Sequence, residues 1–151
     1  MTEPAAEQIT TLTPTNEHSR RAFEYLQANL GIKMPQFWAE LAEARPEAMA
    51  GYLQLRQHTM RDTDEGAALP KKIKELALVA ENIIKVNPWA VKVHTKAAIR
   101  AGATLDELWE VIVLVIAESG MILYKMAGYD AVLAAREAVE GIRNGVEDGH
   151  G

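Results

Sequence analysis

The stretch that decides the fold is NPWAVKVHTKAAIRAGATLDE, residues 87–107. Asn87 before Pro88 predicts a helix start, because asparagine caps free N–H groups and proline suits the first turn. Gly102 follows the last residue of the helical pattern, where a left-handed residue ends many helices. The Thr-x-x-Glu spacing of residues 104–107 is a capping box, so a second helix begins at once. Two helices joined by a tight glycine turn therefore organise this region.

Similar signals divide the rest of the chain. Pro35, Pro46 and Pro70 each open a stretch with helical periodicity, and Gly31 and Gly128 are predicted helix stops. The chain contains no Asn-Gly turn between alternating strands, so the predicted fold class is all-α, a compact helical domain. The predicted helices cover about residues 16–30, 35–44, 46–62, 70–86, 88–101, 104–126 and 129–144. We expect residues 1–15 to be a flexible N-terminal arm, 16–145 a single helical domain and 146–151 a flexible tail.

Residues 111–116, VIVLVI, are rich in β-branched side chains and by themselves fit a buried strand. The capping box before them and the apolar stripe that runs through them favour a helix instead. A helix that is apolar on every side needs to be covered by neighbouring helices or by another subunit.

The amino-acid composition excludes or disfavours several classes of function. The 151 residues carry 16 Lys and Arg against 21 Asp and Glu, a net charge of −5, which disfavours binding to nucleic acid or to an anionic membrane. The absence of cysteine excludes disulfides, thiolate metal sites and thiol redox chemistry. The basic cluster at residues 71–74 is expected to be the solvated rim of a helix start. No signal peptide or membrane span is evident, so we expect a cytoplasmic protein with no metal and no cofactor.

Helix 70–86 is predicted to bury a core stripe made of Ile73, Leu76, Ala77, Ala80, Ile83 and Ile84. A second stripe carries Glu75 and Asn82 together with apolar residues. A carboxylate there is either a catalytic group or a residue at the edge between the buried and the exposed faces of the helix, where it pairs with a lysine. The following helix carries His94 among alanines at i−4, i+3, i+4 and i+7, which places the imidazole in a hollow between close-packed helices. Such a histidine needs a hydrogen-bond partner, which is either the protein itself or a substrate. Glu118 interrupts an apolar helix, and it either lines the same hollow or pairs across a subunit interface.

Three motifs carry a resemblance to a known family: LPKKIKEL at residues 69–76, HTKAAIRAGAT at 94–104 and DEL at 106–108. Together they resemble the carboxymuconolactone decarboxylase family, whose superfamily includes the alkyl hydroperoxidase D-like proteins. The resemblance covers about residues 65–128. It implies an all-helical, alkyl hydroperoxidase D-like fold and a homo-oligomer, either a trimer or a hexamer.

In the peroxidase-type branch of this superfamily, a Cys-x-x-Cys pair precedes the histidine. Those two positions hold Asn87 and Ala90 here, whereas the acid and the histidine of that branch match Glu75 and His94. Reduction of a peroxide needs one thiolate that attacks and another that resolves. Peroxidase or peroxiredoxin activity is therefore predicted to be absent.

The decarboxylase branch also lacks the cysteine pair, and it acts on a carboxylate-bearing lactone in aromatic compound catabolism. By this resemblance we predict a cofactor-independent lyase or isomerase of a small organic acid or lactone. His94 is the candidate general acid and base, with Glu75 as its partner. The alternative is a non-catalytic oligomeric binding or structural member of the same family. The candidate substrate-binding residues are Asn82, Asn87, Trp89 and Glu118.

Overall fold

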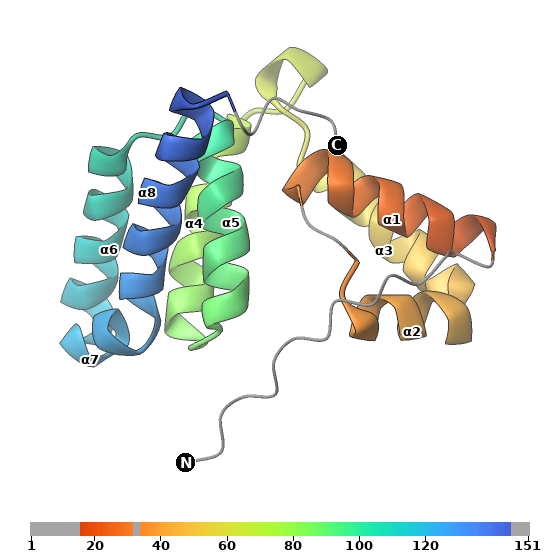
Figure 1. Cartoon of the computed structure of the whole chain (residues 1–151), viewed down its shortest axis with the longest axis horizontal. Coiled ribbons are helices and arrows are strands. Elements are labelled where there is room, and N and C mark those ends of the chain that lie inside the picture. The colour runs from red at the N-terminus through yellow and green to blue at the C-terminus, as the bar shows by residue number, and fades with distance from the viewer. Residues whose placement is uncertain (1–15, 32–33, 146–151) are drawn as a thin grey trace. The chain divides into compact units, whose positions relative to one another are not determined.

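A computed structural model describes residues 16–31 and 34–145, and every regular element in these ranges is a helix (Figure 1). This confirms the predicted all-α class. The predicted arm 1–15 and tail 146–151 lie outside the described residues. The chain divides into two compact units, one ending at Met60 and one beginning at Arg61, which we describe separately. The single domain expected over residues 16–145 stays a prediction.

The first unit consists of α1 (Glu17–Leu30), α2 (Gln36–Ala44) and α3 (Pro46–Thr59). Asn16 and Ser19 form a capping box that begins α1, and Gly31 ends it with a φ of 61°, as predicted. The three helices pack on one another around buried apolar side chains such as Leu26 and Met49.

The second unit begins with a 3₁₀ turn, η1 (Thr63–Glu65), and continues with α4 (Lys71–Ile84) and α5 (Pro88–Arg100). These two helices form a hairpin, α5 packs on α8 (Tyr129–Arg143), and α6 (Leu105–Ser119) packs on α4 and α8 (Figure 1). The core between them consists mainly of apolar side chains, among them Val79, Val91 and Ile112.

The stretch 87–107 adopts the predicted structure. The Asn87 side chain accepts a hydrogen bond from the Ala90 N–H at 3.2 Å. Gly102 has a φ of 91°, and the N–H groups of Gly102 and Ala103 donate to carbonyls of α5 at 3.0 and 2.9 Å, a Schellman motif. Thr104 caps α6 through both hydrogen bonds of the capping box. The hairpin and the α5–α6 turn are therefore set by local sequence.

The predicted continuous helix over 104–126 is wrong at Gly120, where the structure interrupts it. α6 ends at Ser119, and Gly120 adopts a φ of 100° that breaks the helix before α7 (Met121–Leu123). Gly128 is not a stop, because it lies inside the π-turn η2 (Tyr124–Gly128) that leads directly into α8. A Cβ atom at Gly128 would lie 3.1 Å from the Tyr124 ring, so the glycine allows a close approach.

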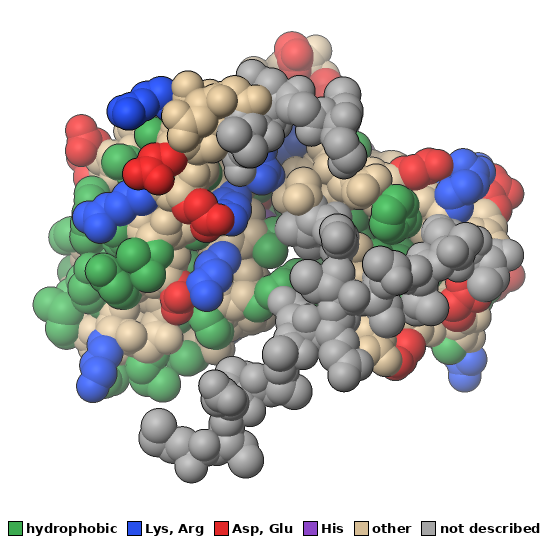
Figure 2. Space-filling view, in the orientation of Figure 1, with side chains coloured by type: hydrophobic (Ala, Val, Ile, Leu, Met, Phe, Trp, Pro, Cys, Tyr) green, Lys and Arg blue, Asp and Glu red, His purple; other side chains and the backbone are tan. Residues whose placement is uncertain are grey.

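Much of α6 and its continuation is not covered within the chain. Leu108, Ile112 and Val115 are buried, but Val113 and Leu114 are 59% and 62% exposed. Hydrophobic side chains gather over α6 in Figure 2, in agreement with these values. Further exposed apolar residues on α7, η2 and α8 are Met121, Ile122, Met126, Tyr129 and Leu133. We call this set, with Val113 and Leu114, the apolar face. None of the described helices is long and apolar enough to cross a membrane.

Candidate active site

α4 supplies Glu75 from its buried side. The helix buries Glu75, Leu76, Val79 and Ile83. The sequence predicts a different core stripe, one that includes Ile73, Ala77 and Ile84, but these three residues are exposed. The buried face is therefore rotated toward Glu75, whose carboxylate lies inside the packed layer rather than at its boundary.

α5 supplies His94 from a face made of short side chains. Ala90, Ala97 and Ala98 are buried, and Ala101 is half-buried. These are the residues one turn before and one to two turns after the histidine on the same side of the helix. The imidazole ring therefore emerges between methyl groups, as the sequence predicts.

The structure brings Glu75 and His94 together. His94 Nδ1 lies 2.8 Å from Glu75 Oε2, and their side chains are 12% and 1% exposed respectively. An ionised carboxylate only accepts hydrogen bonds, so with Glu75 ionised the donor of this contact is Nδ1–H. The partner of Glu75 is thus a histidine, not the lysine of the alternative interpretation.

The second ring nitrogen of His94 makes no hydrogen bond with any residue of the described ranges. With Nδ1 protonated, Nε2 of the neutral imidazole is a proton acceptor. The pair therefore presents one oriented basic nitrogen on a side chain that remains partly accessible.

The other predicted site residues have different surroundings. The Asn82 amide donates to the Leu78 carbonyl at 2.8 Å, and Asn87 caps α5, so both amides take part in helix structure. Trp89 is half-buried in the first turn of α5. Glu118 is exposed near the end of α6, and it forms no ion pair with a described residue. An exposed carboxylate does not line a buried hollow, so its pairing across a subunit interface stays a prediction.

The basic cluster at the start of α4 holds neighbouring segments. Lys72 Nζ bonds Glu107 Oε1 at 2.7 Å, and this hydrogen bond is the main cause that lowers the pKa of Glu107. Lys74 Nζ donates to the Arg61 carbonyl at 2.7 Å. Asp62 accepts from the backbone N–H of Lys71 at 3.0 Å, which is the main cause of the lowered pKa of Asp62. Two of the three lysine side chains therefore fix the N-terminal end of α4.

The sequence does not predict that two buried polar side-chain atoms lack a hydrogen-bond partner in the described part of the chain. The Thr95 hydroxyl, beside His94 in the chain, and His18 Nδ1 have no hydrogen-bond partner among the residues that the structure describes. Among the described residues, no group of three histidine or carboxylate side chains lies together as a metal site would require. A threonine or histidine at a helical position gives no sequence signal that separates a satisfied side chain from an unsatisfied one.

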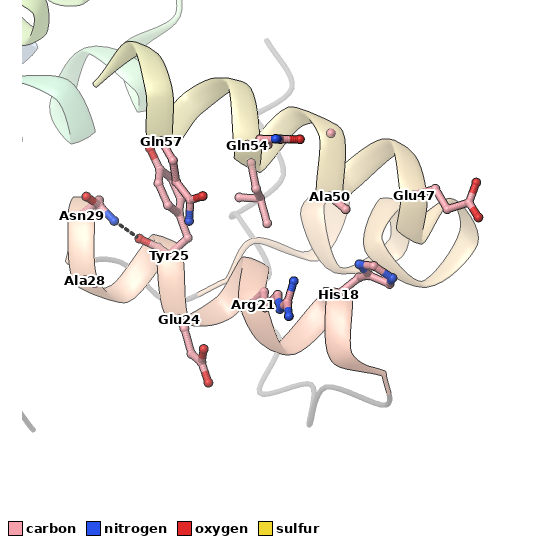
Figure 3. A pocket seen from close by; sticks show the side chains of 12 residues that line it. His18, Arg21, Glu24, Tyr25, Ala28, Asn29, Glu47, Ala50, Gln54 and Gln57 are labelled. Carbon is pink, nitrogen blue, oxygen red and sulfur yellow. Dashed lines mark hydrogen bonds between the residues drawn. The ribbon is translucent and has the colours of Figure 1, made fainter. Parts of the chain in front are cut away.

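A cavity of about 920 Å³ lies in the first unit, between α1 and α3. Figure 3 shows His18, Arg21 and Tyr25 on α1 and Gln54 on α3 along it. All its lining residues belong to the first unit, so Glu75 and His94 do not form it. Sequence reasoning missed this cavity, because polar residues at helical spacing are typical of an ordinary solvent-exposed face.

Comparison with known proteins identifies the family. Residues 46–141 match the carboxymuconolactone decarboxylase family. A crystal structure from Burkholderia xenovorans LB400, described as a candidate carboxymuconolactone decarboxylase, is 31% identical, with a TM-score of 0.77. The match covers 85% of this chain and 96% of that one. This chain belongs to the carboxymuconolactone decarboxylase family.

A second crystal structure, the apo form of a carboxymuconolactone decarboxylase family protein from Legionella pneumophila, is 24% identical, with a TM-score of 0.47. That match covers 87% of this chain and 99% of the other. No curated protein matches the chain. Within the carboxymuconolactone decarboxylase family, the present sequence holds an acid–histidine pair and no cysteine.

Proposed function

We propose that the protein is a cofactor-independent lyase or isomerase that acts on a small organic acid or lactone through proton transfer at His94 Nε2. The observation that supports this is the 2.8 Å contact between a fully buried carboxylate and a partly accessible imidazole. A buried carboxylate is expensive unless its partner compensates it, and here the partner is the group that would transfer the proton.

For a lyase, the reaction would proceed by loss of carbon dioxide. The bond between the substrate carbon and its carboxylate breaks, and the electron pair moves onto the adjacent carbonyl as an enolate. His94 takes a proton from water at Nε2, gives that proton to the carbon and so returns to the neutral form. For an isomerase, Nε2 takes the proton from one carbon and returns it to another.

Glu75 orients the ring and stabilises the imidazolium. Its hydrogen bond to Nδ1–H fixes the tautomer that leaves Nε2 basic. When Nε2 is protonated, the carboxylate 2.8 Å from Nδ1 offsets the new positive charge inside the packed layer. Glu75 is therefore a positioning residue in this mechanism and does not contact the substrate.

Thiol chemistry has no role in the proposed reaction. The positions that hold the cysteine pair in the peroxidase-type branch are Asn87 and Ala90, and this sequence contains no cysteine. Neither side chain forms a thiolate that attacks a peroxide. Peroxidase activity is therefore still predicted to be absent. We propose that the protein acts in the breakdown of aromatic compounds and that it does so in the cytoplasm.

The exposed apolar face supports a homo-oligomer, a trimer or a hexamer, as the working form. Exposed apolar surface of this kind is typical of a surface that another chain covers. Glu118 lies one turn after Leu114 on α6, and in such an assembly it would pair across the interface.

A non-catalytic oligomer is the second candidate function. It is favoured by the structural use of the Asn82 and Asn87 amides, which leaves fewer polar groups for a substrate. In that case His94 is a core histidine whose partner is Glu75, and its replacement affects only stability.

The test is proton exchange in D₂O. The protein is incubated with a panel of small carboxylic acids and lactones, and ¹H NMR follows deuterium incorporation or loss of carbon dioxide. We expect turnover of at least one compound, and a loss of about 100-fold or more in His94→Gln. His58→Gln, which changes an exposed histidine of α3, is the matched control and keeps full activity. Equal turnover by His94→Gln and the unmodified protein would exclude the mechanism.

A further inference from the structure

The basic cluster of residues 71–74 contains one side chain that the fold does not use. Six lysines and arginines of the described ranges are half-buried. Five of them bond a described partner through their charged groups: Arg56, Arg61, Lys72, Lys74 and Lys96. Among these six, only the ammonium of Lys71 makes neither a hydrogen bond nor an ion pair.

Lys71 lies on the same face of α4 as Glu75. The two residues are four positions apart, which places them one above the other, about 6 Å apart along the helix axis. α4 and α5 are joined by the short turn 85–87 and pack against each other along their length, so they run antiparallel. Lys71 is therefore level with the part of α5 that follows His94.

The α5 side chains at that level are short. Ala97, Ala98 and Ala101 follow His94 on its own face of the helix. Only methyl groups of α5 therefore lie at the level of Lys71 on that face, and a lysine carries its charge on a flexible four-carbon stem. Lys71 thus lies about one helical turn along α4 from the Glu75–His94 pair.

The ammonium of Lys71 contributes little to folding. A cation in the first turn of a helix opposes the helix dipole. Lys72 and Lys74 compensate this cost with Glu107 and the Arg61 carbonyl. The charge of Lys71 acts on Asp62, but the pKa of that carboxyl is lowered chiefly by backbone N–H groups, and the ammonium is a minor cause. A partner for this cation is therefore to be sought outside the described chain.

We propose that the Lys71 ammonium binds the carboxylate of the substrate and so holds the adjacent carbon against His94 Nε2. This inference rests on the proposed acid–base function and names the residue that selects an anionic substrate. A compact ammonium suits a single carboxylate oxygen in a partly buried position, where a charge-assisted hydrogen bond is strong.

The test uses acetate as the probe and acetamide as its uncharged analogue, at constant ionic strength because salt screens such contacts. The full-length protein is labelled with ¹⁵N-histidine, and the His94 signals among the four histidines are assigned with His94→Gln. We expect acetate to shift the His94 Nε2 signal, and Lys71→Met to weaken that binding by about tenfold or more. Lys71→Arg keeps most of the binding.

Lys85→Met is the matched control, because Lys85 is an exposed lysine of the same hairpin that pairs with Glu81. It is expected to bind acetate as the unmodified protein does. The melting temperature of Lys71→Met is expected to change by less than about 3 °C, which separates lost binding from lost folding.

Three results would overturn the inference, and they differ in their consequence. If acetate shifts His94 equally in Lys71→Met, or if acetamide binds as well as acetate, Lys71 does not hold the carboxylate, while the proposed function stands. If acetate leaves His94 unchanged even in the unmodified protein, no carboxylate binds beside the imidazole. In that case both the inference and the organic-acid function fail.

Discussion

The α4–α5 hairpin and the α6–α7 region differ in which side chains they bury: the hairpin buries a charged group, whereas the α6–α7 region exposes apolar ones. The hairpin places a carboxylate, Glu75, in the packed layer with 1% of its side chain exposed. The α6–α7 region places Leu114 and Ile122 outside it. A buried charge and an exposed apolar patch are the two observations that call for an explanation beyond folding. This difference is the basis for proposing chemistry at the hairpin and assembly at the apolar face.

The largest expected effect on stability is at Glu75. Glu75→Ala leaves His94 Nδ1 without its partner and opens a space in the packed layer, so unfolding should become easier by about 3 kcal/mol. Chemical denaturation measures this change. Glu81→Ala, which removes an exposed partner of Lys85, is the control and should cost less than about 0.5 kcal/mol. Equal losses in the two variants would mean that Glu75 is not a buried, compensated charge.

A charge placed in the apolar face tests whether this face is the interface between subunits. Leu114→Asp should dissociate the oligomer into smaller species in native mass spectrometry, because a carboxylate in a closed apolar interface loses its hydration. Leu55→Asp changes a leucine of α3 that is 60% exposed, and it should leave the assembly intact. A monomeric unmodified protein, or dissociation by Leu55→Asp alone, would show that the apolar face is not the interface.

A smaller change in stability is expected at Thr95, which is next to His94 in the chain. Its hydroxyl is buried and has no partner within residues 16–31 and 34–145, so Thr95→Val, which has nearly the same shape, should stabilise the fold by about 1 kcal/mol. Thermal denaturation measures the gain. Thr63→Val, at an exposed position of η1, serves as the control for the substitution itself. Destabilisation by Thr95→Val would indicate that the hydroxyl is bonded in solution.

The turn between α4 and α5 contains backbone strain. Val86 has a φ of 52°, a left-handed conformation that is costly for a β-branched residue. Val86→Gly should stabilise the protein by about 0.5–1 kcal/mol, because the side chain is partly exposed and little burial is lost. Val139→Gly, in the interior of α8, should destabilise it instead. Urea denaturation compares the two, and a loss at Val86 would contradict the assigned backbone conformation.

The smallest effect concerns acid pH. The hydrogen bond from Lys72 lowers the pKa of Glu107 from its ordinary value of 4.5. A carboxyl with a lowered folded-state pKa stabilises the fold above its unfolded value, and this contribution disappears as the pH falls through the folded value. Glu107→Gln should therefore flatten the loss of stability below about pH 4.5. Melting curves from pH 3 to 6 test this, and an unchanged slope would count against the Lys72 contact.

The sequence was most informative where local chemistry decides the structure. The cap at Asn87 and the turn at Gly102 follow from single residues, and the structure shows both. The pairing of Glu75 with His94 is implied by the family resemblance rather than by helical spacing, and the structure places Glu75 Oε2 2.8 Å from His94 Nδ1. Local hydrogen bonds and helical periodicity therefore account for much of the second unit.

The sequence was least informative where the packing of neighbours decides the structure. Periodicity shows which side of a helix is apolar but not how much of it other helices cover, so Ile73 and Ile84 were placed in the core although they are exposed. Glycine fits both helical and left-handed backbone, so Gly128 was predicted to be a stop whereas Gly120 is the break. The cavity between α1 and α3 depends on side-chain orientation, which has no sequence signal.

The most direct test of the account is the tautomer of His94 at neutral pH, read by ¹⁵N NMR of the imidazole nitrogens. The account predicts a protonated Nδ1 that exchanges slowly with water and an unprotonated Nε2, and Glu75→Gln should remove this preference. A ring protonated at Nε2, or one that averages freely between both forms, would contradict the claim that a buried carboxylate fixes a basic nitrogen for proton transfer.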